Sequence, residues 1–427
     1  MANNPTNSHF TFSKLFRSIL HSSLAISAGL LLCFLIFGAF TNSSPKKTSV
    51  PNKDWVATWS TAPQLVEPNN MPPAPGLSNN TLRQVVCVSI GGKSLRVKFS
   101  NDFSKSAVTM KSVQIAVSKG ESAIEIATIK ELKFNGKSDV TMEPGVAITS
   151  DPVKFDLKPR MEVAITISFG ETSPDVTGHP GSRTTSYLLA GSHTSKDDFS
   201  AAVKTDHWYV INGIDVKAPK SAAVAIIGNS ITDGRGSGTN KQNRWPDILA
   251  QRLLKNPETK NIGVLNLGIG GNCVLRGGLG PTALSRFERD ILTQHGVKWV
   301  IILEGVNDIG GTRNKAAASK VAKGLVDAYG KMIDDAHAKG LKVYGATITP
   351  INKSSYYSDY HEYARDSVNE WIRNSGRFDA VIDFDKTIRN PADKITLLPE
   401  AQTGDYLHPN EAGYQIMGES IDLNLFK

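Results

Sequence analysis

The 427-residue sequence predicts two folds in succession, an all-β sandwich and an α/β fold built on a parallel sheet. From about residue 54 to 216, short apolar segments of period two are separated by turn residues, which is typical of an antiparallel, jelly-roll-like sandwich. After Pro219, continuous apolar strands alternate with segments of helical period, which is typical of a parallel sheet covered on both faces. We therefore expect residues 54–216 to form a β-sandwich accessory domain and residues 217–427 to form a second, α/β domain.

In the β-rich part the clearest local pattern is at residues 85–99. Two apolar runs, 85–90 and 95–99, flank the pair Gly91-Gly92, and this pattern predicts a β-hairpin with a two-glycine turn. Period-two alternation predicts further strands at 113–117, 124–129, 146–149, 161–168, 185–189 and 208–215.

In the α/β part, strands are predicted at 223–227, 264–267, 299–303, 343–348 and 380–384. Helices are predicted at 245–254, 281–292, 316–338, 360–374 and 410–423. Polar loops at 228–233, 268–272 and 305–308 directly follow strands, and the 405–408 loop comes after the last strand. Because open parallel sheets bind ligands beyond the carboxyl ends of their strands, we expect these loops to meet at one edge.

The N-terminus carries an export signal pattern. Residues 24–40 are apolar and uncharged, and Lys14 and Arg17 precede them. The length of this run leaves both a cleaved signal and a retained membrane anchor open. Basic residues before the run favour export of the rest of the chain, to the periplasm, the outside or the outer face of a membrane. Residues 41–53 read as a flexible linker.

The net charge of +8 does not predict a nucleic-acid partner. Residues 1–53 contribute five basic residues and no Asp or Glu, which leaves 43 basic against 40 acidic residues in the remainder. Three cysteines, Cys33, Cys87 and Cys273, give neither a disulfide framework nor a zinc spacing. The sequence has no His-Glu-x-x-His motif, and Gly268-x-Gly270 lacks the third glycine of a dinucleotide loop. We expect neither a metal nor a cofactor.

Ser230 is the first candidate for chemistry, because it follows a predicted buried strand at a polar, glycine-rich turn. The alternative is a purely structural role, in which this serine caps the following helix. Thr232 stands where the second glycine of a Gly-x-Ser-x-Gly elbow would be, which disfavours an ordinary α/β-hydrolase.

His408 is the candidate base, because Asp405 lies three residues before it. One tight loop can bring the carboxylate to Nδ1 of the ring and leave Nε2 free to accept a proton from a hydroxyl. The alternative is that Asp405 caps the helix predicted from about residue 410.

Asn307 and Gly271 are candidate donors for a developing oxyanion. Asn307 offers a side-chain amide, and Gly271 and Ser230 offer backbone N–H groups. The alternative for Asn307 and Asp308 is an ordinary turn. A nucleophile, a base, a carboxylate and oxyanion donors are the parts that acyl transfer requires, so the sequence predicts a serine esterase.

Residues 221–427 resemble the SGNH hydrolases, also called GDSL esterases/lipases. The resemblance rests on four blocks: Gly228-Asn229-Ser230, Asn266 to Gly271-Asn272, Gly305-Val-Asn307-Asp308 and Asp405-Tyr-Leu-His408-Pro409. It implies a flavodoxin-like three-layer sandwich, a catalytic set of Ser230, Asp405 and His408, and oxyanion donors at Ser230, Gly271 and Asn307. Asn229 departs from the aspartate of the usual Gly-Asp-Ser-Leu signature, which implies altered local hydrogen bonding with catalysis retained.

The β-rich part is similar to the domain that precedes this fold in exported bacterial esterases, some of which are associated with plant-polysaccharide breakdown. We therefore expect a carboxylic ester hydrolase that acts on short-chain or acetyl esters of carbohydrate through an acyl-serine intermediate. A small-molecule or polysaccharide ester is the expected partner, with a membrane involved only through the N-terminal segment. The alternatives are a lipase- or phospholipase-like acylhydrolase with an apolar rim at 275–279, a non-catalytic carbohydrate-binding surface module, and acyl transfer to a sugar acceptor.

Overall fold

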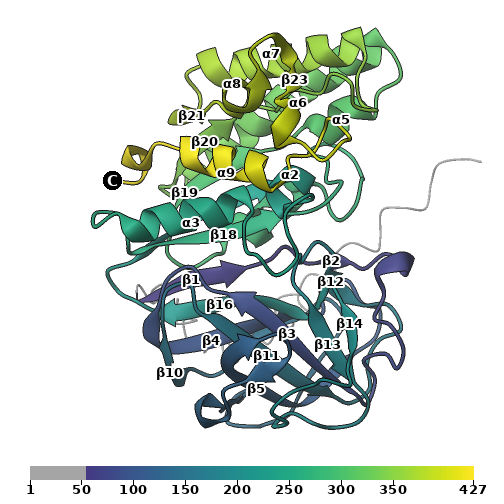
Figure 1. The fold of residues 1–427 in the computed structure, drawn as a ribbon, viewed down its shortest axis with the longest axis vertical. Helices are drawn as coiled ribbons and strands as arrows, with labels where there is room; N and C mark the ends of the chain where they lie inside the picture. Colours follow the sequence, from purple (N-terminus) through teal and green to yellow (C-terminus); the bar gives the residue numbers. More distant parts are fainter. Residues whose placement is uncertain (1–53) are drawn as a thin grey trace, which may run out of the picture. The chain divides into compact units, whose positions relative to one another are not determined.

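The computed structural model describes residues 54–427, and its first half is built from antiparallel strands (Figure 1). One sheet has the order β1 (Trp55–Ser60), β16 (Ile211–Lys217), β4 (Gly92–Ser100), β10 (Val153–Leu157), and β9 (Ala147–Thr149) also pairs with β4. A second sheet has the order β14 (Val203–Thr205), β13 (Ser186–Leu189), β3 (Thr81–Cys87), β11 (Glu162–Phe169), β5 (Val108–Gly120), β6 (Ala123–Ile124). Two short strands, β7 (Lys130–Leu132) and β8 (Val140–Met142), also pair with β5. A small sheet contains β15 (Trp208–Tyr209), β12 (Thr177–His179) and β2 (Gln64–Leu65).

The two large sheets bury apolar side chains against one another. Val97 and Phe99 of β4 share a core with Ile115 of β5 and Ile165 of β11. Along β4 buried residues alternate with more exposed ones, as the pleat of a strand with one buried face requires. The predicted β-sandwich is confirmed.

The predicted hairpin at residues 85–99 is wrong. Strand β3 pairs with β11 and β13, whereas β4 pairs with β16, β10 and β9, so the two strands belong to different sheets. A Cβ on Gly91 would lie 2.3 Å from the Leu157 carbonyl oxygen, and one on Gly92 would lie 2.3 Å from a methyl carbon of Val216. The two glycines therefore allow close packing where the chain crosses between sheets, and they do not form a hairpin turn.

Two other strand predictions need correction. The segment 208–215 is divided at Val210, whose φ of +68° breaks the extended backbone, so that β15 and β16 join different sheets. Only the start of 124–129 is strand, because residues Ile126–Thr128 form the 3₁₀ helix η2.

The second half contains a five-stranded parallel sheet with the order β18 (Ile262–Gly268), β17 (Ala222–Gly228), β19 (Val297–Leu303), β20 (Lys342–Ala346), β21 (Ala380–Ile382). This order, 2-1-3-4-5, is flavodoxin-like, as predicted. The helices are α2 (Ser230–Asp233), α3 (Trp245–Lys255), α4 (Ala283–Phe287), α5 (Val306–Gly310), α6 (Lys315–His337), α7 (Asp359–Asn374), α8 (Phe384–Ile388) and α9 (Glu411–Ser420). Helix α4 continues into the π-helical turn η3 (Glu288–Leu292). Smaller elements are η1 (Pro68–Asn70), η4 (Pro399–Ala401), η5 (Leu423–Phe426) and the pair β22 (Arg389–Asn390) and β23 (Asp393–Leu397).

Successive residues of β17 face opposite cores. Val224 and Ile226 pack in a cluster with residues of α3, α8 and α9, and Ala225 and Ile227 pack in a cluster that includes residues of α6 and α7. Every residue of β17 is buried, which is why the strand reads as a continuous apolar run. The predicted three-layer α/β arrangement is confirmed.

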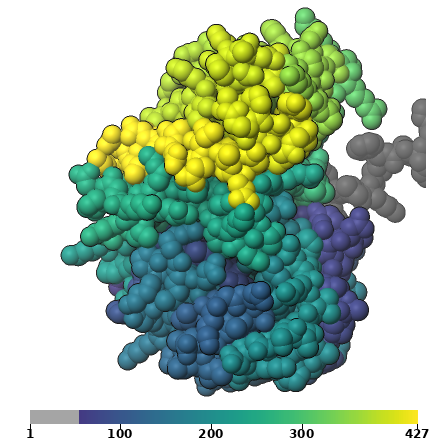
Figure 2. Space-filling model, viewed as in Figure 1, coloured from purple at the N-terminus to yellow at the C-terminus, as the bar shows by residue number. Residues whose placement is uncertain are grey.

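The β-rich part contacts the α/β part directly. Ala57 N–H of β1 donates to the His295 carbonyl at 2.9 Å, and the Val264 N–H of edge strand β18 donates to the Ser89 hydroxyl at 3.0 Å. The buried Asp215 carboxylate lies 3.0 Å from the His295 ring. Residues 54–427 consequently belong to one compact unit, whose two halves are in contact in Figure 2. The division into two domains near residue 216 stays a prediction.

The N-terminal predictions, an export signal or anchor at 24–40 and a linker at 41–53, fall outside the described residues. Between residues 54 and 427, no helix has both the length and the apolar character that crossing a membrane demands.

Candidate active site

The carboxyl ends of three strands bring the predicted site loops together. Gly228 at the end of β17 pairs in register with Gly268 of β18 and with Leu303 of β19. The segments that follow these strands carry Ser230, Gly271 and Asn307, and they therefore start at the same level of the sheet. This is the edge at which parallel α/β sheets bind ligands.

Ser230 is the first residue of the short helix α2, and the cap of that helix is its neighbour. The Asn229 side chain accepts a hydrogen bond from the Ile231 N–H at 3.0 Å, so Ser230 is free of the capping role. Gly268 allows α2 to approach, since a Cβ there would lie 2.4 Å from the Asp233 nitrogen. Gly234, with φ of +104°, ends the helix in the left-handed conformation.

His408 and Asp405 complete a hydrogen-bonded chain to Ser230. The Ser230 hydroxyl donates to His408 Nε2 at 2.8 Å, and His408 Nδ1 donates to Asp405 Oδ2 at 2.6 Å. The backbone N–H groups of Leu407 and His408 donate to Asp405 Oδ1, each at 2.9 Å. The alternative role for Asp405 is wrong, because the side chain of Asn410 caps α9.

The electrostatics of this chain favour a neutral imidazole beside an ionised carboxylate. Partial burial opposes the charge of Asp405, but hydrogen bonds from the His408 backbone, its ring and the Leu407 N–H together hold the pKa of the carboxyl below its usual range. Burial lowers the pKa of His408 below its ordinary value, although Asp405 opposes that shift. The Asp405 side chain is 41% exposed and that of His408 is 9% exposed. A neutral ring with Nε2 facing a hydroxyl can accept its proton.

The three residues predicted to supply oxyanion donors, Ser230, Gly271 and Asn307, line the same pocket. Gly271 has φ of +70°, and its N–H has no hydrogen-bond acceptor within residues 54–427. Ser230 N–H, at the start of a helix, has no intrahelical acceptor. The Asn307 amide donates one hydrogen to the Asn272 carbonyl at 2.7 Å and accepts from the Tyr356 hydroxyl at 3.0 Å, which fixes its orientation and leaves its second N–H available.

Asp308 positions the loop that carries Gly271 and does not line the pocket. Its carboxylate accepts from the Val274 N–H at 2.8 Å and from the Leu275 N–H at 3.0 Å. The alternative of an ordinary turn is wrong, because both residues lie in helix α5 (Val306–Gly310). Asn307 lines the pocket, and Asp308 anchors the loop that carries Gly271.

A buried arginine beneath the site escaped the sequence analysis. Arg286 of α4 donates to the carbonyl oxygens of Gly228 at 3.2 Å and of Leu267 at 2.6 Å, and to the Asn272 side chain at 3.0 Å. It therefore ties the ends of β17 and β18 to the oxyanion loop. Only its place in the helical segment after that loop was visible in the sequence, and nothing local signals its contacts.

Asn229, the departure from the family signature, faces a buried carboxyl. Its side-chain nitrogen lies 3.5 Å from Glu304 Oε2, and the other carboxyl oxygen of Glu304 is 3.7 Å from Arg286. Burial raises the pKa of Glu304 to about 8, while Arg286 opposes that rise. An amide at position 229 avoids a second carboxylate beside Glu304, which gives a physical reason for this residue.

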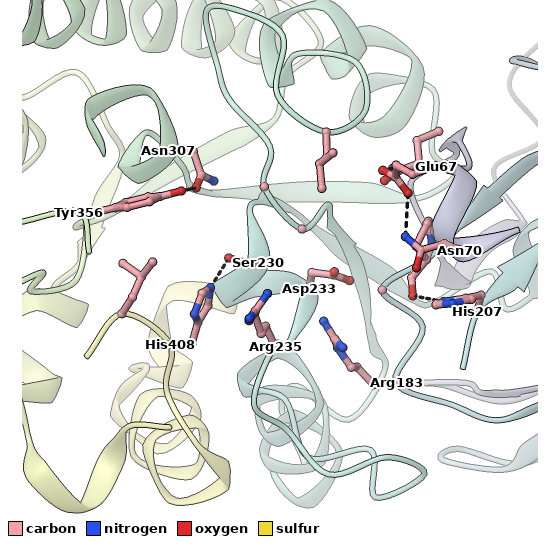
Figure 3. Close-up of a pocket in the computed structure, with 17 residues that line it drawn as sticks. Glu67, Asn70, Arg183, His207, Ser230, Asp233, Arg235, Asn307, Tyr356 and His408 are labelled. Carbon is pink, nitrogen blue, oxygen red and sulfur yellow. Dashed lines mark hydrogen bonds between the residues drawn. The ribbon is translucent and has the colours of Figure 1, made fainter. Parts of the chain in front are cut away.

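The candidate site opens into a pocket of about 350 Å³ (Figure 3). Ser230, Gly271, Asn307 and His408 line it together with Tyr356. One wall comes from the β-rich part, through residues Gln64, Glu67, Asn70, Pro180, Arg183 and His207. Sequence analysis missed this wall entirely, because it depends on how the β-rich part packs against the α/β part.

Competing chemistries find little support within residues 54–427. Burial raises the pKa of both Cys87 and Cys273 to about 12, which disfavours the reactive thiolate form. This part of the chain also contains no cluster of three or more His, Cys, Asp or Glu arranged to hold a metal ion.

The comparison with protein families supports an esterase or acylhydrolase. Residues 226–416 match the model of the GDSL-like Lipase/Acylhydrolase family, which supports an SGNH, or GDSL, hydrolase. A comparison with curated proteins gave no match.

Several solved structures are similar to this chain over somewhat less than half of its length. A member of the lipolytic protein G-D-S-L family from Veillonella parvula is 23% identical, with 47% of this chain and 96% of that chain covered and a TM-score of 0.35. A GDSL-like lipase from Bacteroides thetaiotaomicron is 20% identical, covering 46% and 84%, with a TM-score of 0.34. An acetyl xylan esterase from Geobacillus stearothermophilus is 20% identical, covering 47% and 93%, with a TM-score of 0.37. At these identities and TM-scores the similarities add nothing to the family match.

Proposed function

We propose that this protein is a serine esterase that hydrolyses carboxylic esters through an acyl-serine intermediate. The observation that carries the proposal is the continuous hydrogen-bonded chain from the Ser230 hydroxyl through the His408 ring to the Asp405 carboxylate. The family-model match at residues 226–416 supports it at the level of an acylhydrolase.

In the proposed reaction, Ser230 Oγ attacks the ester carbonyl carbon while His408 Nε2 takes the hydroxyl proton. The carbonyl oxygen becomes negative and accepts hydrogen bonds from the N–H groups of Ser230 and Gly271 and from the Asn307 amide. As the ester C–O bond breaks, His408 returns the proton to the departing alcohol. Water then attacks the acyl-serine with His408 again as base, which releases the acid and restores the serine.

For the substrate we propose short acyl groups, acetyl above all, on carbohydrate. The pocket wall from the β-rich part is polar and offers hydrogen-bonding groups at Gln64, Asn70 and His207, as the hydroxyls of a sugar require. Export of the protein, indicated only by residues 24–40, would bring it to such substrates outside the cytoplasm.

A longer acyl chain is the second candidate, because one edge of the pocket is apolar. Leu279 lines the pocket and is 46% exposed, and Leu275 nearby in sequence is 36% exposed. These side chains lie in the segment 275–279, for which the sequence predicts an apolar rim in the lipase alternative. The pocket thus has both polar and apolar lining residues. The dependence of turnover on acyl chain length therefore decides between a carbohydrate ester and a lipid as substrate.

The test is hydrolysis of 4-nitrophenyl esters from acetate to laurate, and of acetylated oligosaccharides, by the full chain. We expect acetate esters to be the best substrates and Ser230→Ala to lower kcat by about 10⁴–10⁶-fold. Ser285→Ala, at an exposed serine of α4 outside the pocket, is the matched control and should hydrolyse acetate at the normal rate. Equal turnover by the Ser230→Ala variant would refute the proposed nucleophile, and a preference for laurate would favour the lipid alternative.

A further inference from the structure

Two arginines in the pocket have no use in the proposed acyl transfer. Arg235 follows α2 directly, and Arg183 lies between β12 and β13 of the β-rich part. Both line the same pocket as Ser230, and in Figure 3 their side chains lie in one row with that of His408. Both positive charges also act on the His408 ring, so they lie close to the reacting groups.

Neither guanidinium is neutralised by the chain. Within residues 54–427 neither takes part in an ion pair, although many other arginines there lie within 4.0 Å of a carboxylate. Nε of Arg183 is buried and has no hydrogen-bond partner in this part of the chain. Residues 1–53 have no Asp or Glu and cannot supply a side-chain carboxylate.

Within residues 54–427 the carboxylates of the pocket form no ion pair with either arginine, and Asp233 Oδ2 is buried without a hydrogen-bond partner. Asp233 accepts from the His179 ring at 2.9 Å. Glu67 accepts from the Gln64 amide at 2.6 Å and from the Asn70 amide at 3.0 Å. The pocket therefore keeps two cationic groups whose hydrogens remain available to a ligand.

Arg183 is held in place by a strained and well-anchored backbone. Its φ of +52° is a left-handed conformation that costs free energy in a residue other than glycine. The Asn240 N–H donates to the Arg183 carbonyl at 2.9 Å, and Nη2 of Arg244 donates to the preceding Ser182 carbonyl at 2.6 Å. Packing of the β-rich part against the α/β part thus fixes this arginine at the pocket wall.

We propose that the ester substrate is anionic: an acylated acidic sugar whose charged group binds Arg183 and Arg235 while Ser230 attacks its acyl ester. The planar guanidinium fork matches the oxygens of a carboxylate, sulfate or phosphate, and a paired arrangement of two forks favours such a group over a neutral hydroxyl. Gln64, Asn70 and His207 remain available to the uncharged hydroxyls of the sugar. This inference rests on the proposed esterase function and specifies its substrate class.

The kinetic test compares matched acetyl esters: methyl O-acetyl-galacturonate, the neutral methyl O-acetyl-galactoside, and the 6-sulfate and 6-phosphate of the latter. With the full chain, we expect kcat/KM for the best anionic ester to exceed that for the neutral ester by about tenfold to a hundredfold. The preference should shrink in 0.5 M NaCl, because salt screens charge. The order among the three anions identifies the charged group.

Arg183→Gln and Arg235→Gln should each reduce the anionic-to-neutral ratio about tenfold, mainly through KM for the anionic ester. The matched control is Arg313→Gln, which changes an exposed arginine outside the pocket and should keep the wild-type ratio. A ratio near one in the wild-type protein, or an unchanged ratio in both pocket variants, would overturn the inference even if neutral acetate is hydrolysed.

A binding measurement separates this inference from the esterase proposal. Calorimetry with full-length Ser230→Ala should show that free galacturonate, or the sulfated or phosphorylated galactoside, binds at least tenfold more tightly than the neutral galactoside. Adding Arg183→Gln should remove that difference. Binding with this pattern but no ester turnover by the wild-type protein would refute the esterase proposal and support the anion site. Ester hydrolysis without preferential anion binding would support the esterase proposal and refute the anion site.

Discussion

Two histidine–aspartate pairs meet the same pocket region, and only one of them can activate a hydroxyl. In the pair near the C-terminus, His408 Nδ1 contacts Asp405 at 2.6 Å and Nε2 faces the Ser230 hydroxyl at 2.8 Å. In the other pair, the ring of His179 on β12 contacts Asp233 of α2 at 2.9 Å. Asp233 lines the pocket, and both members of this second pair are buried.

The difference lies in what the second ring nitrogen faces. His179 Nδ1 lies 3.0 Å from the Ala62 carbonyl oxygen, so both of its nitrogens face oxygen acceptors. With an oxygen facing each ring nitrogen, His179 has no nitrogen left to face a substrate or a serine. His179 therefore joins the β-rich part to α2, whereas His408 keeps one nitrogen for chemistry. Both pairs consist of a histidine and an aspartate. Their roles differ because the second ring nitrogen faces the Ser230 hydroxyl in one pair and the Ala62 carbonyl oxygen in the other.

The largest expected effect comes from removing the active ring. His408→Ala should lower kcat for an aryl acetate by about 10⁴–10⁶-fold, because it removes the ring nitrogen that faces the Ser230 hydroxyl. His179→Leu should lower kcat far less, since His179 does not contact Ser230. Steady-state kinetics of the two variants test this contrast, and losses of similar size would show that the two pairs do not differ as described.

Asp405→Asn should come next, with kcat reduced by about 10⁴-fold. An amide nitrogen at this position donates where the carboxylate accepts, which favours the ring tautomer with its hydrogen on Nε2 and blocks proton transfer from Ser230. The same kinetic assay checks it. A loss smaller than about tenfold would mean that the Asp405 contact merely orients the loop.

Asn307→Ala should reduce kcat by about 10²–10³-fold, since one oxyanion donor is lost. Tyr356→Phe is the matched control, because it removes the hydrogen bond to the Asn307 side-chain oxygen and keeps the amide hydrogens. We expect its loss to be about tenfold or less. If both variants lose activity equally, Asn307 acts only through its orientation of the loop.

The pair formed by His179 and Asp233 should matter to stability. His179→Leu leaves the Asp233 carboxylate buried without its partner and should lower the free energy of unfolding by about 3–5 kcal/mol. Adding Asp233→Asn removes the uncompensated charge and should recover part of that loss. Urea unfolding of the single and double variants gives the coupling between the two residues, and strictly additive losses would show that the His179–Asp233 contact does not stabilise the fold.

The smallest effect concerns pH. Burial lowers the pKa of His408, and the ring must be neutral to accept the serine proton. Activity should therefore be lost as the pH falls through the pKa of His408, with a midpoint of kcat/KM below the ordinary value of about 6.5. A pH–rate profile from about 4.5 to 8 tests this, and a midpoint above 6.5 would contradict the direction of the shift.

Local sequence patterns predicted the strands of the parallel sheet and the residues of the candidate site. The parallel strands are continuous apolar runs because both of their faces are buried, and the blocks around Ser230 and Asn307 follow them at short range. The hairpin at Gly91-Gly92 failed because a pair of glycines signals close packing as readily as a turn, and only long-range pairing separates the two cases.

What the sequence could not reveal depends on contacts between distant segments. Arg183 reaches the pocket through the packing of the β-rich part on the α/β part, and Arg286 binds carbonyl oxygens from two strands. His179 and Asp233 are 54 positions apart, with no motif to join them. Such residues have ordinary neighbours in the chain, so their roles appear only when the fold is known.

The most direct measurement is covalent labelling of the full chain with an aryl organophosphate, read by mass spectrometry of the intact protein and its peptides. One adduct on Ser230 is the expected result, absent in Ser230→Ala and formed far more slowly in His408→Ala. Ester hydrolysis that persists while Ser230 stays unlabelled, or an adduct on another residue, would contradict the assignment of this serine as the nucleophile.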